Sequence, residues 1–327
     1  MNIYPVSFGF LQPFCDEYVD FVDDPGVADF VLMMNTGGAG CMDLLKFART
    51  TADKYEIPFC FWTIEDPNAY LGFLAQAKVA DYVFTSDGAL LPQYRKDLGH
   101  NRVHWLPLAA SEAYHKPLPL REDATDAVFS GNWYDSQWVA RKWGVDTVIL
   151  PLAEAGYSIT TFSLDEPPYP ILMQAPNRWI GPSDPLSPGY YSAVAQQYTF
   201  GKIVLGVNNQ RSHMDGRGLT TMTSMRTPEA LACGKPFLAS QSDAYKALGL
   251  LDAGYYIMGV ADTPEQTLSW VENMIDLDKP AGRSPSARAM AMGENGRHFV
   301  LEHHTYGRRM ERIMACLQGD PGSETWE

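Results

Sequence analysis

The sequence has 327 residues and a formal net charge of −14, with 25 lysine and arginine residues against 39 aspartate and glutamate residues. Hydrophobic residues make up 46% and charged residues 20%, a balance that is typical of a folded globular protein and excludes a disordered or fibrous chain. The acidic balance disfavours broad binding to nucleic acid or to anionic lipid, because both of these carry negative charge.

Cysteine spacing and hydropathy exclude further classes. The five cysteines are scattered and form no C-x-x-C pair, so neither a zinc ribbon nor a disulfide framework is expected. The first ten residues lack the basic start and the cleavage site of a signal peptide, and no apolar run is long enough to span a membrane. We therefore expect a cytoplasmic protein without a membrane span.

The first third of the chain alternates strands with helices. We predict strands at 28–34, 58–63, 82–85 and 102–106, and helices at 42–55, 71–78 and 90–98. Nearly continuous apolar strands separated by amphipathic helices predict an α/β fold with a parallel sheet and right-handed crossovers. Residues 1–110 are therefore expected to form one Rossmann-like domain.

A second region of alternating strands and helices follows an interruption of this pattern. Residues 107–126 combine prolines with mixed charges and are interpreted as an interdomain connector. Beyond them we predict strands at 127–130, 157–162, 202–207 and 237–239, and helices at 139–154, 190–200 and 264–275. A second Rossmann-like domain is thus expected over residues 125–298.

The segment from Met225 to Ser240 contains a short helix followed by a strand. Thr227 is a good N-cap, Pro228 suits the first helical position and Gly234 suits the position just after the helix. The free N–H groups at such a helix start favour an anionic diphosphate.

Two charged residues of this segment suit a nucleotide ligand. Glu229 in the first turn can accept two hydrogen bonds from a ribose diol, and Arg226 can neutralise phosphate. The alternative is a well-capped structural helix whose first-turn glutamate is solvated.

The segment R-T-P-E-A-L-A-C-G resembles the R-x-x-E-A-L-A-C-G segment of CgeB-like glycosyltransferases, a group with the GT-B fold. Further stretches are similar to that family in the same order: F-W-T-I-E-D-P at 61–67, A-D-Y-V-F-T-S-D at 80–87, L-P-L-A-A at 106–110 and F-S-G-N-W-Y at 129–134. The resemblance implies two Rossmann-like domains facing a cleft, with a last helix at 299–317 that packs back towards the first domain. It also implies a nucleotide-sugar donor, UDP- or GDP-linked, held mainly by the second domain, and no cofactor.

The resemblance also implies residue roles in the donor domain. Glu229 matches the acidic residue expected to bind the donor ribose, and Arg226 and Lys202 would face the diphosphate. Turn residues after the predicted strands are expected at the ligand edge of the sheet as well. The predicted donor-binding residues are Gly131, Asn132, Lys202, Asn208, Arg226, Thr227 and Glu229.

The first domain is expected to hold the acceptor. Glu65 and Asp66 follow the strand at 58–63, and Asp87 occupies the equivalent position after the next strand. A carboxylate there can act as the base that an inverting transfer to a hydroxyl needs, although a retaining transfer needs none. Because Asp66 directly precedes Pro67, we expect it to cap the next helix, which leaves Glu65 as the better candidate for the base.

Three further sequence patterns are weaker indications of a binding or metal site. Gly37 and Gly38 lie in a glycine-rich turn without G-x-G-x-x-G spacing, which we interpret as a tight turn that can also contact acceptor or phosphate. The D-x-D string at 276–278 ends a predicted helix instead of a strand and is interpreted as solvated. His298, His303 and His304 lack metal-binding spacing, so no metal is expected.

The leading hypothesis is therefore a metal-independent glycosyltransferase that moves a sugar from a nucleotide diphosphate to an unknown acceptor. One alternative is a DNA-modifying, phage-type glycosyltransferase, which the net charge of −14 disfavours. Another is a nucleotide-sugar binding protein without catalysis. A nicotinamide oxidoreductase is disfavoured because neither half carries the dinucleotide fingerprint. The acceptor, the stereochemical outcome and the oligomeric state stay open.

Overall fold

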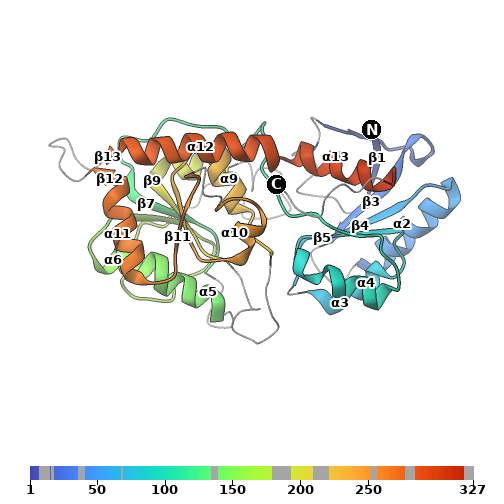
Figure 1. Ribbon diagram of the computed structural model, residues 1–327, viewed down its shortest axis with the longest axis horizontal. Coiled ribbons are helices and arrows are strands. Elements are labelled where there is room, and N and C mark those ends of the chain that lie inside the picture. The colour runs from blue at the N-terminus through green and yellow to red at the C-terminus, as the bar shows by residue number, and fades with distance from the viewer. Residues whose placement is uncertain are drawn as a thin grey trace. The chain divides into compact units, whose positions relative to one another are not determined.

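The computed structural model describes residues 1–6, 15, 18–35, 41–67, 69–133, 139–178, 193–208, 221–251, 256–276 and 284–319. The chain divides into two compact units, each built around a parallel sheet (Figure 1). The first unit contains residues 1–108, Thr221, Met222 and the C-terminal segment that begins at Tyr306. The second unit contains the described residues from Ala109 to Asn208 and from Thr223 to Thr305.

In the described part of the first unit, six parallel strands run in the order β2-β1-β3-β4-β5-β6. The strands are β1 (Asn2–Val6), β2 (Asp20–Phe21), β3 (Phe30–Asn35), β4 (Phe59–Thr63), β5 (Tyr82–Thr85) and β6 (Val103–Trp105). The helices are η2 (Pro25–Val27), α2 (Cys41–Tyr55), α3 (Tyr70–Ala77), η3 (Gly88–Leu90), α4 (Leu91–Leu98) and α13 (Tyr306–Leu317). Every residue of β4 is buried, as expected of a strand whose sheet is covered on both faces.

Helix α13 is held in the first unit by a buried arginine, although it lies at the far end of the chain. The Arg309 side chain is fully buried and donates hydrogen bonds to the carbonyl oxygens of Pro107, at 2.7 Å, and Leu108, at 3.3 Å. Burial lowers the pKa of Arg309 to about 9. These bonds fasten α13 to the segment that follows β6.

In the described part of the second unit, five parallel strands run in the order β11-β10-β9-β7-β8. They are β7 (Thr125–Ser130), β8 (Ile159–Phe162), β9 (Gly201–Gly206), β10 (Phe237–Ser240) and β11 (Gly259–Ala261), and a separate two-stranded sheet joins β12 (Ile275–Asp276) to β13 (Ser284–Pro285). The helices are α5 (Val139–Gly144), the π-helical η4 (Val145–Ile149), α6 (Leu150–Glu154), η5 (Leu172–Gln174), α8 (Val194–Gln197), η6 (Tyr198–Phe200), α9 (Arg226–Ala232), α10 (Asp243–Ala247), α11 (Pro264–Met274) and α12 (Ala287–His303). Helices α9 and α12 pack against each other.

The predicted α/β fold with two parallel sheets is confirmed, but the prediction of one continuous helix at 299–317 is wrong. The supposed connector, 107–126, contains the fully buried side chains of Ser111 and His115, and its residues from Ala109 onward belong to the second unit. The single helix predicted at 299–317 is two helices, α12 and α13. The chain leaves helical geometry between them because Thr305 pairs with Ala110 as an isolated β-bridge.

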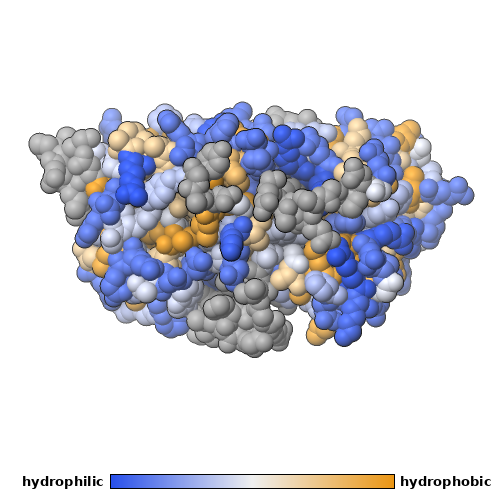
Figure 2. All heavy atoms as spheres, viewed as in Figure 1, coloured by the Kyte–Doolittle hydropathy of each residue, from blue (hydrophilic) through white to orange (hydrophobic). Residues whose placement is uncertain are grey.

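No described helix combines the length and the apolar character that crossing a membrane requires. On the face shown in Figure 2, hydrophilic side chains predominate and hydrophobic ones form scattered patches.

Candidate functional site

Polar residues that follow the parallel strands of the second unit gather along one edge of its sheet. Gly131 and Asn132 follow β7, and Asn208 lies two residues beyond the end of β9, the strand that pairs with β7. Parallel strands end at the same edge, which is where open α/β sheets bind ligands. The structure therefore brings these three predicted residues to one place.

A buried arginine joins the ends of β7 and β9. Arg141 donates through Nη1 to the Val207 carbonyl oxygen, at 2.8 Å, and through Nη2 to the Asn132 carbonyl oxygen. Gly131 has a φ of +152°, and a Cβ atom there would lie 3.2 Å from Arg141 Nη2. The backbone conformation at position 131 favours glycine, and a Cβ atom there would crowd Arg141.

Asn208 attaches the segment before α9 to this edge. Its Nδ2 donates to the Tyr245 hydroxyl at 2.6 Å, and its Oδ1 accepts from the Ser224 backbone N–H at 3.1 Å. The Asn208 side chain is buried, and both of its polar atoms bind protein groups. Through Ser224 it fixes where α9 begins.

Helix α9 starts earlier than the sequence predicts. Its N-cap is Met225, so the prediction that Thr227 is the N-cap is wrong. The Ser224 hydroxyl accepts from the Arg226 N–H at 3.3 Å, which places the first helical turn at Arg226. Gly234 follows the C-cap with a φ of +69°, as predicted for that position.

Two predicted donor-binding residues of α9 form a buried ion pair. Arg226 Nη1 donates to Glu229 Oε2 at 2.8 Å, and the Glu229 side chain is fully buried. Burial raises the pKa of Glu229 to about 7 against the opposing charge and hydrogen bond of Arg226. Because nothing of Glu229 is exposed, a ligand reaches its carboxylate only after neighbouring groups shift.

His115 faces this ion pair and was missed by the sequence analysis. Its Nε2 lies 3.7 Å from Glu229 Oε1, and its Nδ1 accepts from the Ser111 N–H at 2.9 Å. Burial, assisted by the charge of Arg226, lowers the pKa of His115 to about 3, so the ring is neutral. No local spacing marks His115, because it reaches Glu229 only through the fold.

Lys202 does not reach the ligand edge, which corrects its predicted role at the diphosphate. It is the second residue of β9, and β9 begins at the opposite edge of the sheet. Lys202 Nζ instead pairs with Asp126 Oδ1 at 2.9 Å, and both side chains are largely buried. Burial raises the pKa of Asp126, but hydrogen bonds from Lys202 and Ser158 outweigh burial and hold that pKa below its ordinary value.

In the first unit, Asp66 lies in a buried network of hydroxyl groups at the end of β4. Its carboxylate accepts hydrogen bonds from the hydroxyls of Thr63, Thr85, at 2.7 Å, and Tyr94, at 3.1 Å. Burial raises the pKa of Asp66 to about 7 despite these bonds. Helix α3 has Ala69 as its N-cap, so the prediction that Asp66 caps it is wrong. The carboxylate turns inward because Thr85 and Tyr94 supply its partners.

Asp87 and Glu65 lie at the same edge in different surroundings. Asp87 is buried and caps η3, and its Oδ1 accepts from Ala89 N at 3.1 Å and from the N and Oγ1 atoms of Thr221 at 2.7 and 3.0 Å. Asp87 thus joins η3 to Thr221, and its catalytic role stays a prediction. The Glu65 side chain is exposed, although enough protein surrounds it for desolvation to raise the pKa of its carboxyl.

Some predictions lie outside the described residues, namely Gly37, Gly38 and the 277–278 part of the D-x-D string. Helix α11 ends at Met274, and Asp276 is the last residue of β12. No cluster of three His, Cys, Asp or Glu residues suited to a metal occurs within the described ranges, and the absence of a metal stays a prediction.

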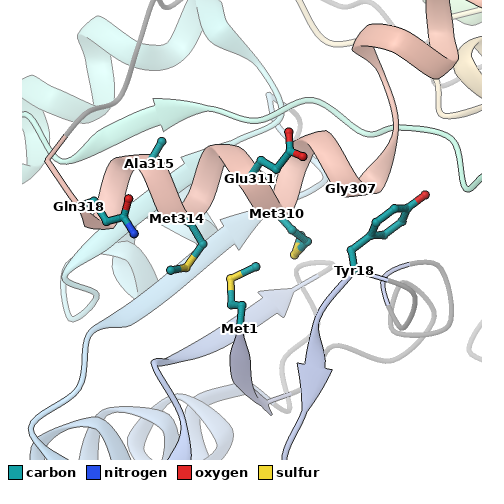
Figure 3. Close-up of a pocket in the computed structure, with 8 residues that line it drawn as sticks. All are labelled: Met1, Tyr18, Gly307, Met310, Glu311, Met314, Ala315 and Gln318. Carbon is teal, nitrogen blue, oxygen red and sulfur yellow. The ribbon is translucent and has the colours of Figure 1, made fainter.

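A cavity in the first unit lies away from these carboxylates. Figure 3 shows Met1, Met310 and Met314 pointing into the space between β1 and α13, beside Tyr18. Met1 directly precedes β1, so the cavity lies at the amino edge of the sheet, opposite the edge where α/β sheets bind ligands.

Comparisons with known proteins support a glycosyltransferase fold. The profile of a family described as Glycosyl transferase-like matches residues 174–315. The structure is similar to that of Alr3699/HepE from Anabaena in complex with UDP and glucose, with a TM-score of 0.54, 12% identity, and coverage of 90% of this chain and 79% of that one. It is also similar to a glycosyltransferase from Rickettsia africae ESF-5, with a TM-score of 0.53, 9% identity and coverage of 97% of each chain. No curated protein matches the sequence. The chain therefore has the GT-B fold.

Proposed function

We propose that this protein is a glycosyltransferase that takes a sugar from a nucleotide diphosphate donor bound by the second unit. The observation that carries the proposal is the Glycosyl transferase-like match over residues 174–315, which contains the Arg226–Glu229 pair. Membership of the CgeB-like group remains the sequence-based expectation. The bound UDP and glucose of the Anabaena protein make UDP-glucose the first donor to test.

The second unit offers groups suited to a nucleotide diphosphate. Arg226 begins α9, and Ser224 links that point to Asn208 at the ligand edge of the sheet. In the proposed complex, the forked donors of Arg226 stabilise the charge that develops on the leaving diphosphate. Glu229 accepts hydrogen bonds from the ribose hydroxyls, and Gly131 lies at the end of β7 on the ligand edge of the sheet.

In the first unit, Glu65 is the carboxylate best placed to meet an acceptor. It follows β4 at the ligand edge and its side chain is exposed, whereas Asp66 and Asp87 are buried and bonded to protein groups. Desolvation raises the pKa of Glu65, and a carboxylate with a raised pKa is a better proton acceptor near neutral pH. We therefore assign the base of an inverting transfer to Glu65.

Binding of a panel of nucleotide sugars, UDP-glucose first, tests the donor. A donor at 100 times its dissociation constant adds about 2.7 kcal/mol of stability, which thermal unfolding detects. Calorimetry then compares wild type with Glu229→Gln, expected to weaken binding by up to about tenfold because an amide oxygen accepts more weakly than a carboxylate. Glu229→Ala is less suitable, because it leaves Arg226 without its buried partner.

The exposed Glu272→Gln in α11 serves as the matched control and should bind like wild type. The donor proposal is wrong if no nucleotide sugar stabilises the wild-type protein. Wild-type affinity in Glu229→Gln would refute the ribose role alone.

A further inference from the structure

The Glu229 carboxylate has one oxygen without a protein donor. Its Oε2 accepts from Arg226, but its Oε1 accepts no hydrogen bond from any residue that the structure describes. A buried carboxylate oxygen that lacks a donor costs free energy, so native proteins rarely leave one unless a ligand or water completes it. The group that faces Oε1 is therefore informative.

The group facing Oε1 is the His115 ring, and its neighbours fix the ring's orientation. The Ser111 N–H donates to Nδ1 at 2.9 Å, and the His115 N–H donates back to the Ser111 carbonyl oxygen, also at 2.9 Å. In a neutral ring whose Nδ1 accepts, the proton is on Nε2. This nitrogen, Nε2, lies 3.7 Å from Glu229 Oε1.

The backbone of His115 is also linked to the helices around the ion pair. Arg297 of α12 donates through Nη1 to the His115 carbonyl oxygen, at 3.5 Å, and to the Ala232 carbonyl oxygen at the end of α9. His115 is thereby fastened to both helices that pack beside Glu229. Arg297 thus holds the backbone of His115, while the Ser111 N–H holds its ring through Nδ1.

We propose that His115 is a positioning residue that holds the Glu229 carboxylate in the orientation needed to bind the two ribose hydroxyls of a nucleotide-sugar donor. A carboxylate oxygen can accept two hydrogen bonds. With Arg226 on Oε2 and His115 facing Oε1, each oxygen keeps one acceptor position for a ribose hydroxyl. This inference rests on the donor role proposed above for Glu229.

Two further buried groups lie beside Glu229. Tyr198 of η6 and Cys233 at the end of α9 both face the Glu229 charge, and burial raises the pKa of each, so both stay uncharged near neutral pH. Arg226 is the cation of the set and already binds Oε2. His115 Nε2 lies 3.7 Å from the other oxygen, Oε1.

Two substitutions of His115 separate positioning from packing. In His115→Gln the side-chain amide N–H replaces Nε2–H, whereas in His115→Asn the shorter amide can replace only the Nδ1 acceptor. His115→Gln leaves the buried Ser111 N–H without its acceptor, and His115→Asn removes the donor that faces Glu229 Oε1. Because each variant affects one buried polar group, we expect similar losses in Tm. We expect calorimetry with UDP-glucose to show binding about tenfold weaker for His115→Asn and within about threefold of wild type for His115→Gln.

A double-mutant cycle shows whether His115 acts through Glu229. In the Glu229→Gln background, His115→Asn should cause little further loss of affinity, because the carboxylate that it positions is absent. Equal affinity losses in His115→Gln and His115→Asn, or a full additional loss in the Glu229→Gln background, would overturn the proposal. Either result would mean that His115 only supports packing.

A measurement without ligand separates this proposal from the donor assignment. Carbon-13 NMR titration of the Glu229 carboxyl should show a higher pKa in His115→Asn than in wild type, and a nearly unchanged value in His115→Gln. If wild type binds no nucleotide sugar while these shifts are seen, the proposed function fails and the pairing of His115 with Glu229 stands. If neither variant moves the Glu229 titration, the positioning proposal fails whatever the protein binds.

Discussion

Because the Asp66 carboxylate is buried, we expect it to make the free energy of unfolding depend on pH. Asp66 is fully buried, and burial raises its pKa from 3.8 to about 7 against three hydroxyl donors. A folded-state pKa above the unfolded value means that the folded protein binds the extra proton between these two pH values. The stability contributed by Asp66 is therefore present below about pH 4 and is lost as pH rises towards 7.

The size of this effect follows from the same two values. A pKa difference between 3.8 and about 7 corresponds to about 4 kcal/mol, because each pH unit in that interval contributes about 1.4 kcal/mol. In Asp66→Asn the side-chain oxygen can still accept hydrogen bonds from two of the three hydroxyl groups, but the side chain no longer titrates. We expect wild type to lose up to about 4 kcal/mol relative to Asp66→Asn between pH 4 and pH 8.

Urea unfolding of both proteins across this pH range measures the difference. Glu229 also has a raised pKa and contributes with the same sign, but it is present in both proteins and cancels in the comparison. The exposed Asp23→Asn is the matched control and should follow the wild-type pH dependence. Parallel stability curves for wild type and Asp66→Asn would refute the reasoning.

Three further predictions follow from the geometry of the two sheets. Glu65→Gln should slow turnover by about 10²–10⁴-fold with unchanged donor affinity, and near-normal steady-state rates would remove Glu65 from the role of base. Lys202→Met should destabilise the protein by about 3–5 kcal/mol, since it removes the cation that pairs with the buried Asp126 carboxylate. Calorimetry should find unchanged donor affinity in this variant, and weaker donor binding in the folded variant would restore Lys202 to the site. Thr221→Val removes hydroxyl contacts with Asp87 and Ala89, so thermal unfolding should show about 1 kcal/mol less stability, and an unchanged Tm would contradict the structural role of this contact.

The fold was largely predictable because its signals are local. Apolar runs marked β3, β4 and β5 nearly to the residue, and the amphipathic segment at 139–154 is helical throughout as α5, η4 and α6. The break between α12 and α13 depends on the pairing of Thr305 with Ala110, which lies far away in the chain. Nothing in the local sequence around 304 encodes that partner.

The site was less predictable because its partners come from distant segments. Sequence position placed Asn208 and Gly131 at strand ends correctly, since the end of a strand is a local property. It could not show that Lys202 pairs with Asp126, or that Thr85 and Tyr94 turn Asp66 inward. The sequence did not indicate His115 for the same reason. Its proposed role depends on its burial beside Glu229 of α9, and not on its spacing from other residues in the sequence.

Release of nucleoside diphosphate from a nucleotide sugar is the measurement that tests the central claim most directly. The purified protein is incubated with UDP-glucose and with the other donors that stabilise it, and free nucleotide is quantified over time with Glu65→Gln as the comparison. We expect slow, protein-dependent release of nucleotide, which falls in Glu65→Gln although that variant binds the donor normally. Saturable donor binding without any release, in the presence or absence of sugar acceptors, would contradict transferase activity and indicate a binding protein instead.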